Sequence, residues 1–135
     1  MINIVLDTNI IISAALSSIG NPAKIINLIV ANENLQLYYS TVILNEYKKV
    51  LSYKRLNFSI GLQTQTINVI INNGICVQPD ISDIPFIDES DRVFYDTAKI
   101  INAYLVTGNL KHYPVEAHII TPLKFLDIFN NDFYI

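Results

Sequence analysis

The sequence predicts an α/β fold of three layers, in which a central parallel sheet is flanked by helices. Short apolar runs rich in β-branched residues alternate with longer amphipathic segments, as in strands joined by crossover helices. A chain of 135 residues with 51% hydrophobic content can fill one large core. Because no repeat, low-complexity tract or long linker divides the chain, we expect a single domain over residues 1–135.

Five apolar segments are expected to form the strands of this sheet. The first is mostly apolar and β-branched over residues 2–6, which is typical of a strand buried on both faces. The expected strands are residues 2–6, 35–39, 75–77, 104–106 and 118–120.

The segments between these strands carry apolar residues at helical spacing. Pro22 suits the first turn of a helix, Ser40 or Thr41 can cap the next one, and Gly74 can end the helix after that. Asp88 is expected to cap the helix before the fourth strand. The expected helices are residues 9–16, 23–32, about 42–51, 62–73, 89–103 and 122–129, and residues 130–135 are expected to fray.

The overall charge does not suggest a dedicated nucleic-acid binder. The net charge is −3 and the pI about 5.2, whereas such binders usually carry a basic face. A nuclease is still allowed, because a carboxylate metal site is itself negative until cations fill it. The local basic group Lys48, Lys49, Lys54 and Arg55 is more typical of a solvated helix face than of a phosphate contact.

Cysteine usage and hydropathy indicate the compartment. Cys76 is the only cysteine, so no internal disulfide can form, and we expect it in a buried strand of a cytoplasmic protein. No uninterrupted apolar stretch approaches the roughly 18 residues of a membrane-spanning helix, so no membrane partner is expected.

Four polar residues are expected to meet where the strands end, at the edge at which such sheets bind ligands: Asp7, Glu46, Asp91 and Asn109. Asp7 directly follows the first strand, where an unpaired buried carboxylate would cost several kcal/mol. Its alternative role is to cap the following helix.

Each of the other acids also has an alternative interpretation. Glu46 lies beside the apolar stripe of its helix, but it could instead form an exposed pair with Lys49, three residues on. Asp91 shares the apolar face of its helix near the first turn, but with Asp88 it also resembles a capping box. Asp88 is the better candidate for a pure cap and the weaker one for the site.

The turn after the fourth strand, Thr107-Gly108-Asn109, supplies further candidates. Glycine would free the backbone for a tight turn. Asn109 could offer a carbonyl oxygen to a cation or position a water, or it could be an ordinary turn residue. Lys111 and His112 could meet a phosphate. The candidates for positioning substrate or water are therefore Thr8, Asn9, Thr107, Lys111 and His112.

Oxygen donors alone favour a hard divalent cation such as Mg²⁺ or Mn²⁺ over zinc. Clustered acids raise one another's pKa until a cation relieves their repulsion. A bound cation lowers the pKa of water and stabilises charge on a phosphate. The four site residues therefore predict metal-dependent phosphodiester chemistry.

Four segments together resemble the PIN domain, from residue 2 to about residue 129. They are Asp7-Thr8-Asn9, Glu46, Asp91 before Phe94 and Ala98, and Leu105-Val106-Thr107-Gly108-Asn109. The resemblance is to the toxin components of bacterial toxin–antitoxin systems. It implies a central parallel sheet between helices and an endoribonuclease that uses one or two Mg²⁺ or Mn²⁺ ions and is held inactive by a cognate antitoxin.

On this match Asp7, Glu46 and Asp91 would hold the metal, with Asn109 as the fourth member of the catalytic set. Many PIN domains have aspartate where this chain has Asn109. The missing charge should weaken cation binding, especially of a second metal.

Other functions remain open. A PIN-fold module that binds RNA or a protein partner with little turnover would explain Asn109, but not the three gathered acids. A phosphatase similar to the haloacid dehalogenase family is disfavoured, because Asn9 stands where a second acid is needed. Apolar residues on the early helices could serve a homodimer, although core packing explains them equally well.

Overall fold

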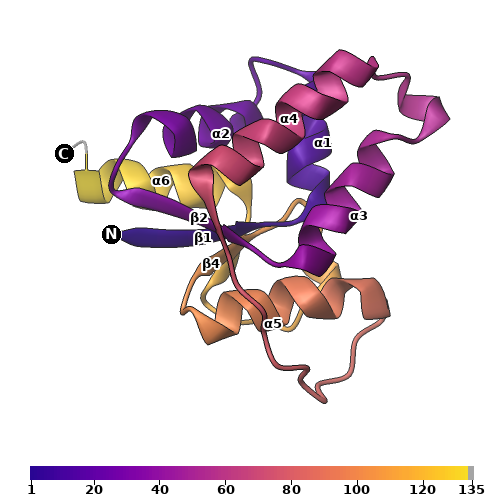
Figure 1. The fold of residues 1–135 in the computed structure, drawn as a ribbon. Coiled ribbons are helices and arrows are strands. Elements are labelled where there is room, and N and C mark those ends of the chain that lie inside the picture. Colours follow the sequence, from indigo (N-terminus) through magenta and orange to yellow (C-terminus); the bar gives the residue numbers. More distant parts are fainter. Residues whose placement is uncertain (134–135) are drawn as a thin grey trace.

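A computed structural model describes residues 1–133 and shows a five-stranded parallel sheet between helices (Figure 1). The strand order is β3-β2-β1-β4-β5, which places β1 at the centre. The predicted sandwich is therefore confirmed. The strands are β1 (Ile2–Leu6), β2 (Leu35–Tyr39), β3 (Gly74–Cys76), β4 (Tyr104–Val106) and β5 (Ile119–Ile120).

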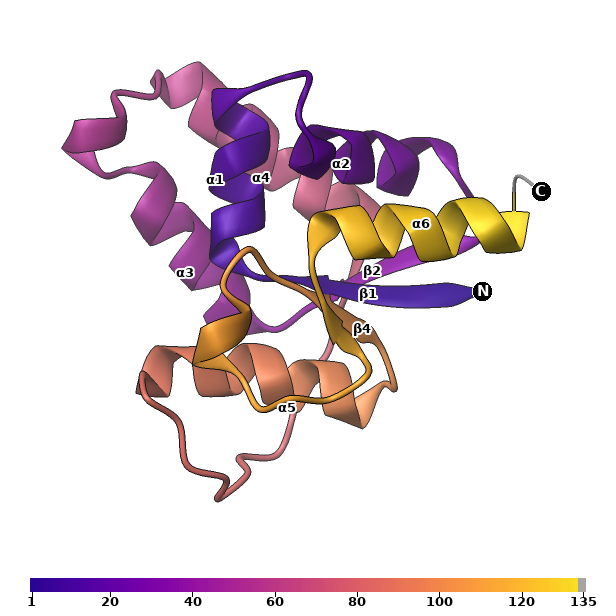
Figure 2. The ribbon, with the colours of Figure 1, turned by 180° about the vertical axis from the view of Figure 1, so that it is seen from behind.

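The helices form two layers around this sheet. One side carries α1, α2, α4 and α6, the other carries α5, and α3 lies beside α1 at the carboxyl-terminal edge (Figures 1 and 2). The α-helices are α1 (Thr8–Leu16), α2 (Asn21–Ala31), α3 (Thr41–Leu51), α4 (Ile60–Asn73), α5 (Arg92–Ile100) and α6 (Pro122–Phe133). Three 3₁₀ turns join them: η1 (Lys54–Leu56), η2 (Glu89–Asp91) and η3 (Leu110–His112).

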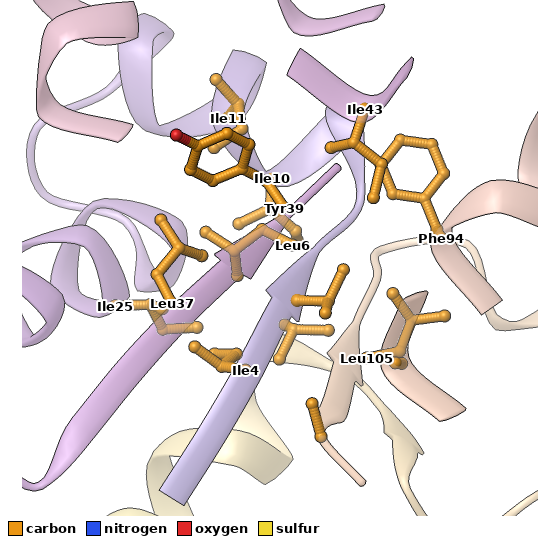
Figure 3. Close-up of a cluster of buried hydrophobic side chains, with 14 of the residues drawn as sticks. Ile4, Leu6, Ile10, Ile11, Ile25, Leu37, Tyr39, Ile43, Phe94 and Leu105 are labelled. Atoms are coloured by element: carbon orange, nitrogen blue, oxygen red, sulfur yellow. The ribbon is translucent and has the colours of Figure 1, made fainter. Parts of the chain in front are cut away.

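The core is built around β1. Figure 3 shows Ile4 and Leu6 of β1 in one apolar cluster with Leu37 of β2, Leu105 of β4 and Phe94 of α5. Fully burying each such side chain contributes about 1.5–3 kcal/mol. Because β1 is packed on both faces, the chain position directly after it, at the carboxyl-terminal edge, is rigidly placed.

The segment expected to form one helix over residues 89–103 starts differently. It opens with the 3₁₀ turn η2, and the α-helix begins only at Arg92. The reason is local, because the Asp88 side chain accepts a hydrogen bond from the Ser90 backbone N–H (3.0 Å) and tightens the first turn.

The same helix also ends earlier than expected, at Ile100. Asn102 adopts the left-handed conformation (φ 53°). The backbone N–H of Ala103 then donates to the Ala98 carbonyl at 2.8 Å, which closes the helix end in the manner of a Schellman motif.

The expectation that Cys76 lies in a buried strand is wrong, since Cys76 is exposed on the edge strand β3. Gly74 ends α4 and opens β3, as predicted. Its side-chain-free backbone is required by close approach: a Cβ there would lie 2.7 Å from both the Ile70 carbonyl oxygen and a ring carbon of Tyr39.

The final helix is longer than expected. Helix α6 continues to Phe133, so residues 130–133 are helical rather than frayed. The rest of the expected frayed tail, residues 134–135, lies outside the described residues.

Within residues 1–133 no single helix is long and apolar enough to cross a membrane. Helices α1 and α2 reach the length and apolar composition of a membrane span only when taken together, and the pair is bent by 99°.

Candidate active site

A cleft of about 350 Å³ opens where the central strands end. The residues that line it come from the starts of α1 and α5, from α3 with η1, and from the turn after β4. Its polar lining residues are Asp7, Thr8, Asn9, Ser13, Glu46, Arg55, Asp88, Ser90, Asp91, Asn109 and His112. Most of the residues predicted from the sequence therefore meet here. The exceptions are Thr107, which is buried behind Asp7, and Lys111, which is exposed on η3 and does not line the cleft.

Asp7 is 6% exposed and joins β1 to α1. Its Oδ1 accepts the Thr8 backbone N–H (2.8 Å) and its Oδ2 accepts the Thr107 hydroxyl (2.7 Å). Burial raises the pKa of Asp7 above its ordinary 3.8, although both hydrogen bonds act in the opposite direction. The side chain is thus a helix cap and a cleft carboxylate at once, with lone pairs left on both oxygens.

Thr107 holds Asp7 and the turn after β4 together. It is fully buried, and its hydroxyl also accepts the Asn109 backbone N–H at 2.9 Å. The expectation that Gly108 frees the backbone for a tight turn is wrong, because no glycine of the described chain has a positive φ. Instead, the Gly108 backbone N–H donates to Oδ1 of Asn9 (3.1 Å), which ties the first turn of α1 to this loop.

Asp91 ends η2 and is 8% exposed. Its Oδ2 accepts no hydrogen bond from any described residue, although Nδ1 of His112 lies 3.3 Å away. Burial, followed by the negative charges of Asp7 and Asp88, raises the pKa of Asp91 to about 6. A buried carboxylate oxygen that accepts no hydrogen bond, with a second acid nearby and only an imidazole within ion-pair distance, is a place where a cation would be stabilised.

Glu46 lies at the cleft with 26% of its side chain exposed, and it forms the ion pair that was its alternative interpretation. Its Oε2 is 3.2 Å from Nζ of Lys49. Such exposed pairs add little stability, so the contact does not lock Glu46 in place. In residues 1–133 no three His, Cys, Asp or Glu side chains are arranged to hold a metal.

At the rim, Asp88 is the helix cap that its sequence context predicted. Its Oδ1 accepts both the backbone N–H (3.0 Å) and the hydroxyl (2.8 Å) of Ser90, and these bonds lower its pKa. Asn109 is exposed, and its Nδ2 lies 3.3 Å from both ring nitrogens of His112. The amide oxygen of Asn109 takes no part in that contact.

Several residues of the site were not predicted, among them Ser13 and Ser90 of the cleft lining and the three described next. The Tyr47 hydroxyl is fully buried and donates to the Leu6 carbonyl (2.5 Å), which ties α3 to the end of β1. A tyrosine on an apolar helix stripe needs such a partner, so its sequence position was a usable signal. Arg55 lines the cleft although its segment was interpreted as a solvated face. Tyr113 is buried near Asp7, whose charge, after burial itself, raises the pKa of its hydroxyl; no sequence signal marks it.

Comparison with known proteins identifies the family of the chain. Residues 3–111 match the model of the PIN domain, and the chain belongs to this family, whose members are generally nucleases. The chain is 26% identical over 143 residues to "Uncharacterized protein MJ1680" of Methanocaldococcus jannaschii, covering 95% of this chain and 92% of that protein.

The fold is also similar to a chain in the crystal structure of VapBC2 from Rickettsia felis bound to a DNA fragment from their promoter. The TM-score is 0.57 at 20% identity, over 82% of this chain and 90% of that chain.

Proposed function

We propose that this protein is a divalent-metal-dependent endoribonuclease of the cytoplasm and the toxin of a type II toxin–antitoxin pair. The observation that carries the proposal is the pairing of Asp7 and Asp91 in one cleft, with the pKa of each raised by burial and that of Asp91 also by the charge of Asp7. Two buried acids that destabilise each other serve no purpose in packing, whereas a bound cation relieves both costs.

The donors fit Mg²⁺ or Mn²⁺ by chemistry, because they are carboxylate oxygens and one of them, the buried Oδ2 of Asp91, accepts no hydrogen bond and has only the His112 imidazole 3.3 Å away. Asp7 and Asp91 would hold the ion, and Glu46 would join them after leaving Lys49. When bound, the ion would acidify a water and neutralise charge on the phosphodiester. Thr107 holds Oδ2 of Asp7 in place by its 2.7 Å hydrogen bond.

The remaining predicted residues would act on substrate or water. Asn109 and His112 stand at the rim, where an amide oxygen and an imidazole can orient a water or a phosphate. Thr8 and Asn9, in the first turn of α1, line the cleft. Lys111 on η3 would contact RNA only outside the cleft.

A catalytically weak PIN-fold module that binds RNA or a protein is the second candidate. It is favoured by Asn109, which replaces the aspartate common in this family, and by the pairing of Glu46 with Lys49. It leaves unexplained why Asp7 and Asp91 are gathered against their repulsion.

A cognate antitoxin is the partner we propose. Membership of the PIN family and the likeness of the fold to a chain of VapBC2 support this assignment. The expected homodimer stays a prediction.

The decisive experiment measures cleavage of RNA by purified protein with Mn²⁺ or Mg²⁺, with EDTA, and with the variant Asp7→Asn. The matched control is Asp127→Asn, the same change on the exposed face of α6. We expect EDTA to abolish cleavage. Asp7→Asn should slow cleavage roughly 100-fold or more, because the variant loses one charged metal ligand, and Asp127→Asn should cleave as the wild type does.

Cleavage that persists in EDTA, or that Asp7→Asn leaves intact, would overturn the proposed chemistry. Protein that binds Mn²⁺ by calorimetry yet cleaves no RNA would instead favour the binding module.

A further inference from the structure

A short basic segment borders the acidic cleft on its α3 side. Arg55 of η1 lines the cleft together with the carboxylates Asp7, Glu46, Asp88 and Asp91. It is exposed, and it forms no ion pair with any carboxylate of residues 1–133. An arginine that pairs with none of the four acids beside it is available to an anion from outside.

A phosphodiester that enters this cleft needs such a cation. The other basic groups near the acids are engaged, since Lys49 pairs with Glu46 (3.2 Å) and His112 lies 3.3 Å from Asp91. Among residues 1–133, Arg55 is thus the cation of the cleft lining that pairs with no carboxylate and can meet a phosphate, and its planar guanidinium suits two phosphate oxygens at once.

Tyr53 adds a second kind of contact. Tyr53 is 37% exposed, and the guanidinium carbon of Arg55 lies 5.3 Å from the centroid of its ring. This cation–π contact holds the two side chains in one unit, which lowers the entropic cost of binding. Exposed aromatic rings beside arginine are the platforms on which unpaired bases stack.

The backbone keeps this unit in place. The Leu56 N–H donates to the Tyr53 carbonyl and the Asn57 N–H to the Lys54 carbonyl, both at 3.1 Å. Asn57 then takes the left-handed conformation (φ 54°), which ends η1. The turn therefore presents Tyr53 and Arg55 at a fixed position relative to α3.

We propose that Tyr53 and Arg55 form a substrate clamp for single-stranded RNA. Arg55 binds a phosphate next to the one that is cleaved, and Tyr53 stacks on the adjoining base. A single strand is required because paired bases in a duplex have no free face for the ring. The proposal rests on the nuclease function proposed for the cleft, and it adds two positioning residues.

The test measures binding of a fluorescein-labelled single-stranded RNA decamer by anisotropy, in EDTA so that the RNA stays intact, over a series of salt concentrations. The variants are Arg55→Gln, Arg55→Lys and Tyr53→Leu. The matched control is Lys24→Gln, which removes one charge from the exposed face of α2. Circular dichroism verifies that each variant is folded.

We expect Arg55→Gln to make the negative slope of log K against log salt shallower by about 0.7 and to weaken binding about tenfold. Arg55→Lys should restore the slope. Tyr53→Leu should weaken binding about tenfold at an unchanged slope, because stacking releases no counterions. Lys24→Gln should match the wild type, and a duplex of the same sequence should bind more weakly than the single strand.

The clamp is overturned if Arg55→Gln behaves as Lys24→Gln does, if the duplex binds as well as the single strand, or if wild-type protein does not bind the decamer. Its failure is separable from that of the nuclease. If the wild type cleaves RNA and Arg55→Gln cleaves it with the same KM, the nuclease proposal stands and the clamp fails. Arg55-dependent binding without any cleavage retains the clamp and loses the nuclease.

Discussion

The cleft has two walls that differ in how they are held. The inner wall, defined by Asp7 and Asp91, is buried (6% and 8% exposed) and rests on the central sheet. The outer wall, defined by Glu46, Arg55, Asn109 and His112, is half-buried or exposed. The inner acids are placed by core packing and by Thr107, whereas the outer residues are held by surface contacts such as the pair of Glu46 with Lys49.

The inner wall carries an electrostatic cost, whereas the outer wall can rearrange. Burial of the inner wall raises the pKa of both acids, so their ionisation at neutral pH opposes folding. The outer wall costs little to rearrange, since exposed ion pairs contribute little. A cation would therefore find two fixed ligands and would recruit Glu46 by a side-chain movement.

Thr107→Val should produce the largest change in stability, because it removes the hydroxyl that donates to the buried Asp7 carboxylate. We expect a loss of about 2 kcal/mol at pH 7, measured by urea unfolding in EDTA. Thr97→Val is the matched control, because the Thr97 hydroxyl is equally buried but donates to a neutral carbonyl, that of Val93. An equal loss in both variants would show that the Asp7 contact is not special.

Asp91→Asn should stabilise the metal-free protein at pH 7. A pKa raised from 3.8 to about 6 means that the carboxyl group stabilises the fold fully below pH 3.8 and loses that contribution as pH rises through 6. The full shift corresponds to roughly 3 kcal/mol, and we expect about 1–2 kcal/mol because the cleft is open to water on one side.

Urea unfolding of wild type and Asp91→Asn from pH 3.5 to pH 7 measures this effect. The gain should vanish near pH 3.5, and Mn²⁺ should stabilise the wild type more than the variant. Asp127→Asn, on exposed α6 surface, should show no such pH dependence. An Asp91→Asn variant that is less stable than wild type at pH 7 would contradict a repulsive inner wall.

Lys49→Ala should have the smallest effect on folding, with a shift in Tm below about 2 °C, because the pair with Glu46 is exposed. Calorimetry should show Mn²⁺ binding a few-fold tighter, roughly 2- to 5-fold, because Glu46 no longer leaves a partner to reach the cation. Lys48→Ala, its exposed neighbour on the same helix turn, is the control. Weaker Mn²⁺ binding by Lys49→Ala alone would mean that Lys49 helps to place Glu46.

The sequence by itself determined the order of the elements and the edge at which the acids gather. Runs such as residues 2–6 are local signals of a buried strand, and Ser40 caps α3 through the Ile43 N–H as expected. An acid directly after a buried strand has to lie at the strand's carboxyl end, so Asp7 could be placed without coordinates.

Tertiary packing alone decided the contacts that site residues make between segments far apart in the chain, whereas local contacts such as that of Glu46 with Lys49 could be foreseen. Oδ2 of Asp91 is buried 3.3 Å from His112, Thr107 donates to Asp7 across 100 residues of chain, and Arg55 reaches the cleft, because these outcomes depend on how the segments pack on the sheet. Periodicity and caps report only on neighbours within about one helical turn. Distances across the cleft, and the burial that raises the pKa of its acids, arise from segments far apart in the chain.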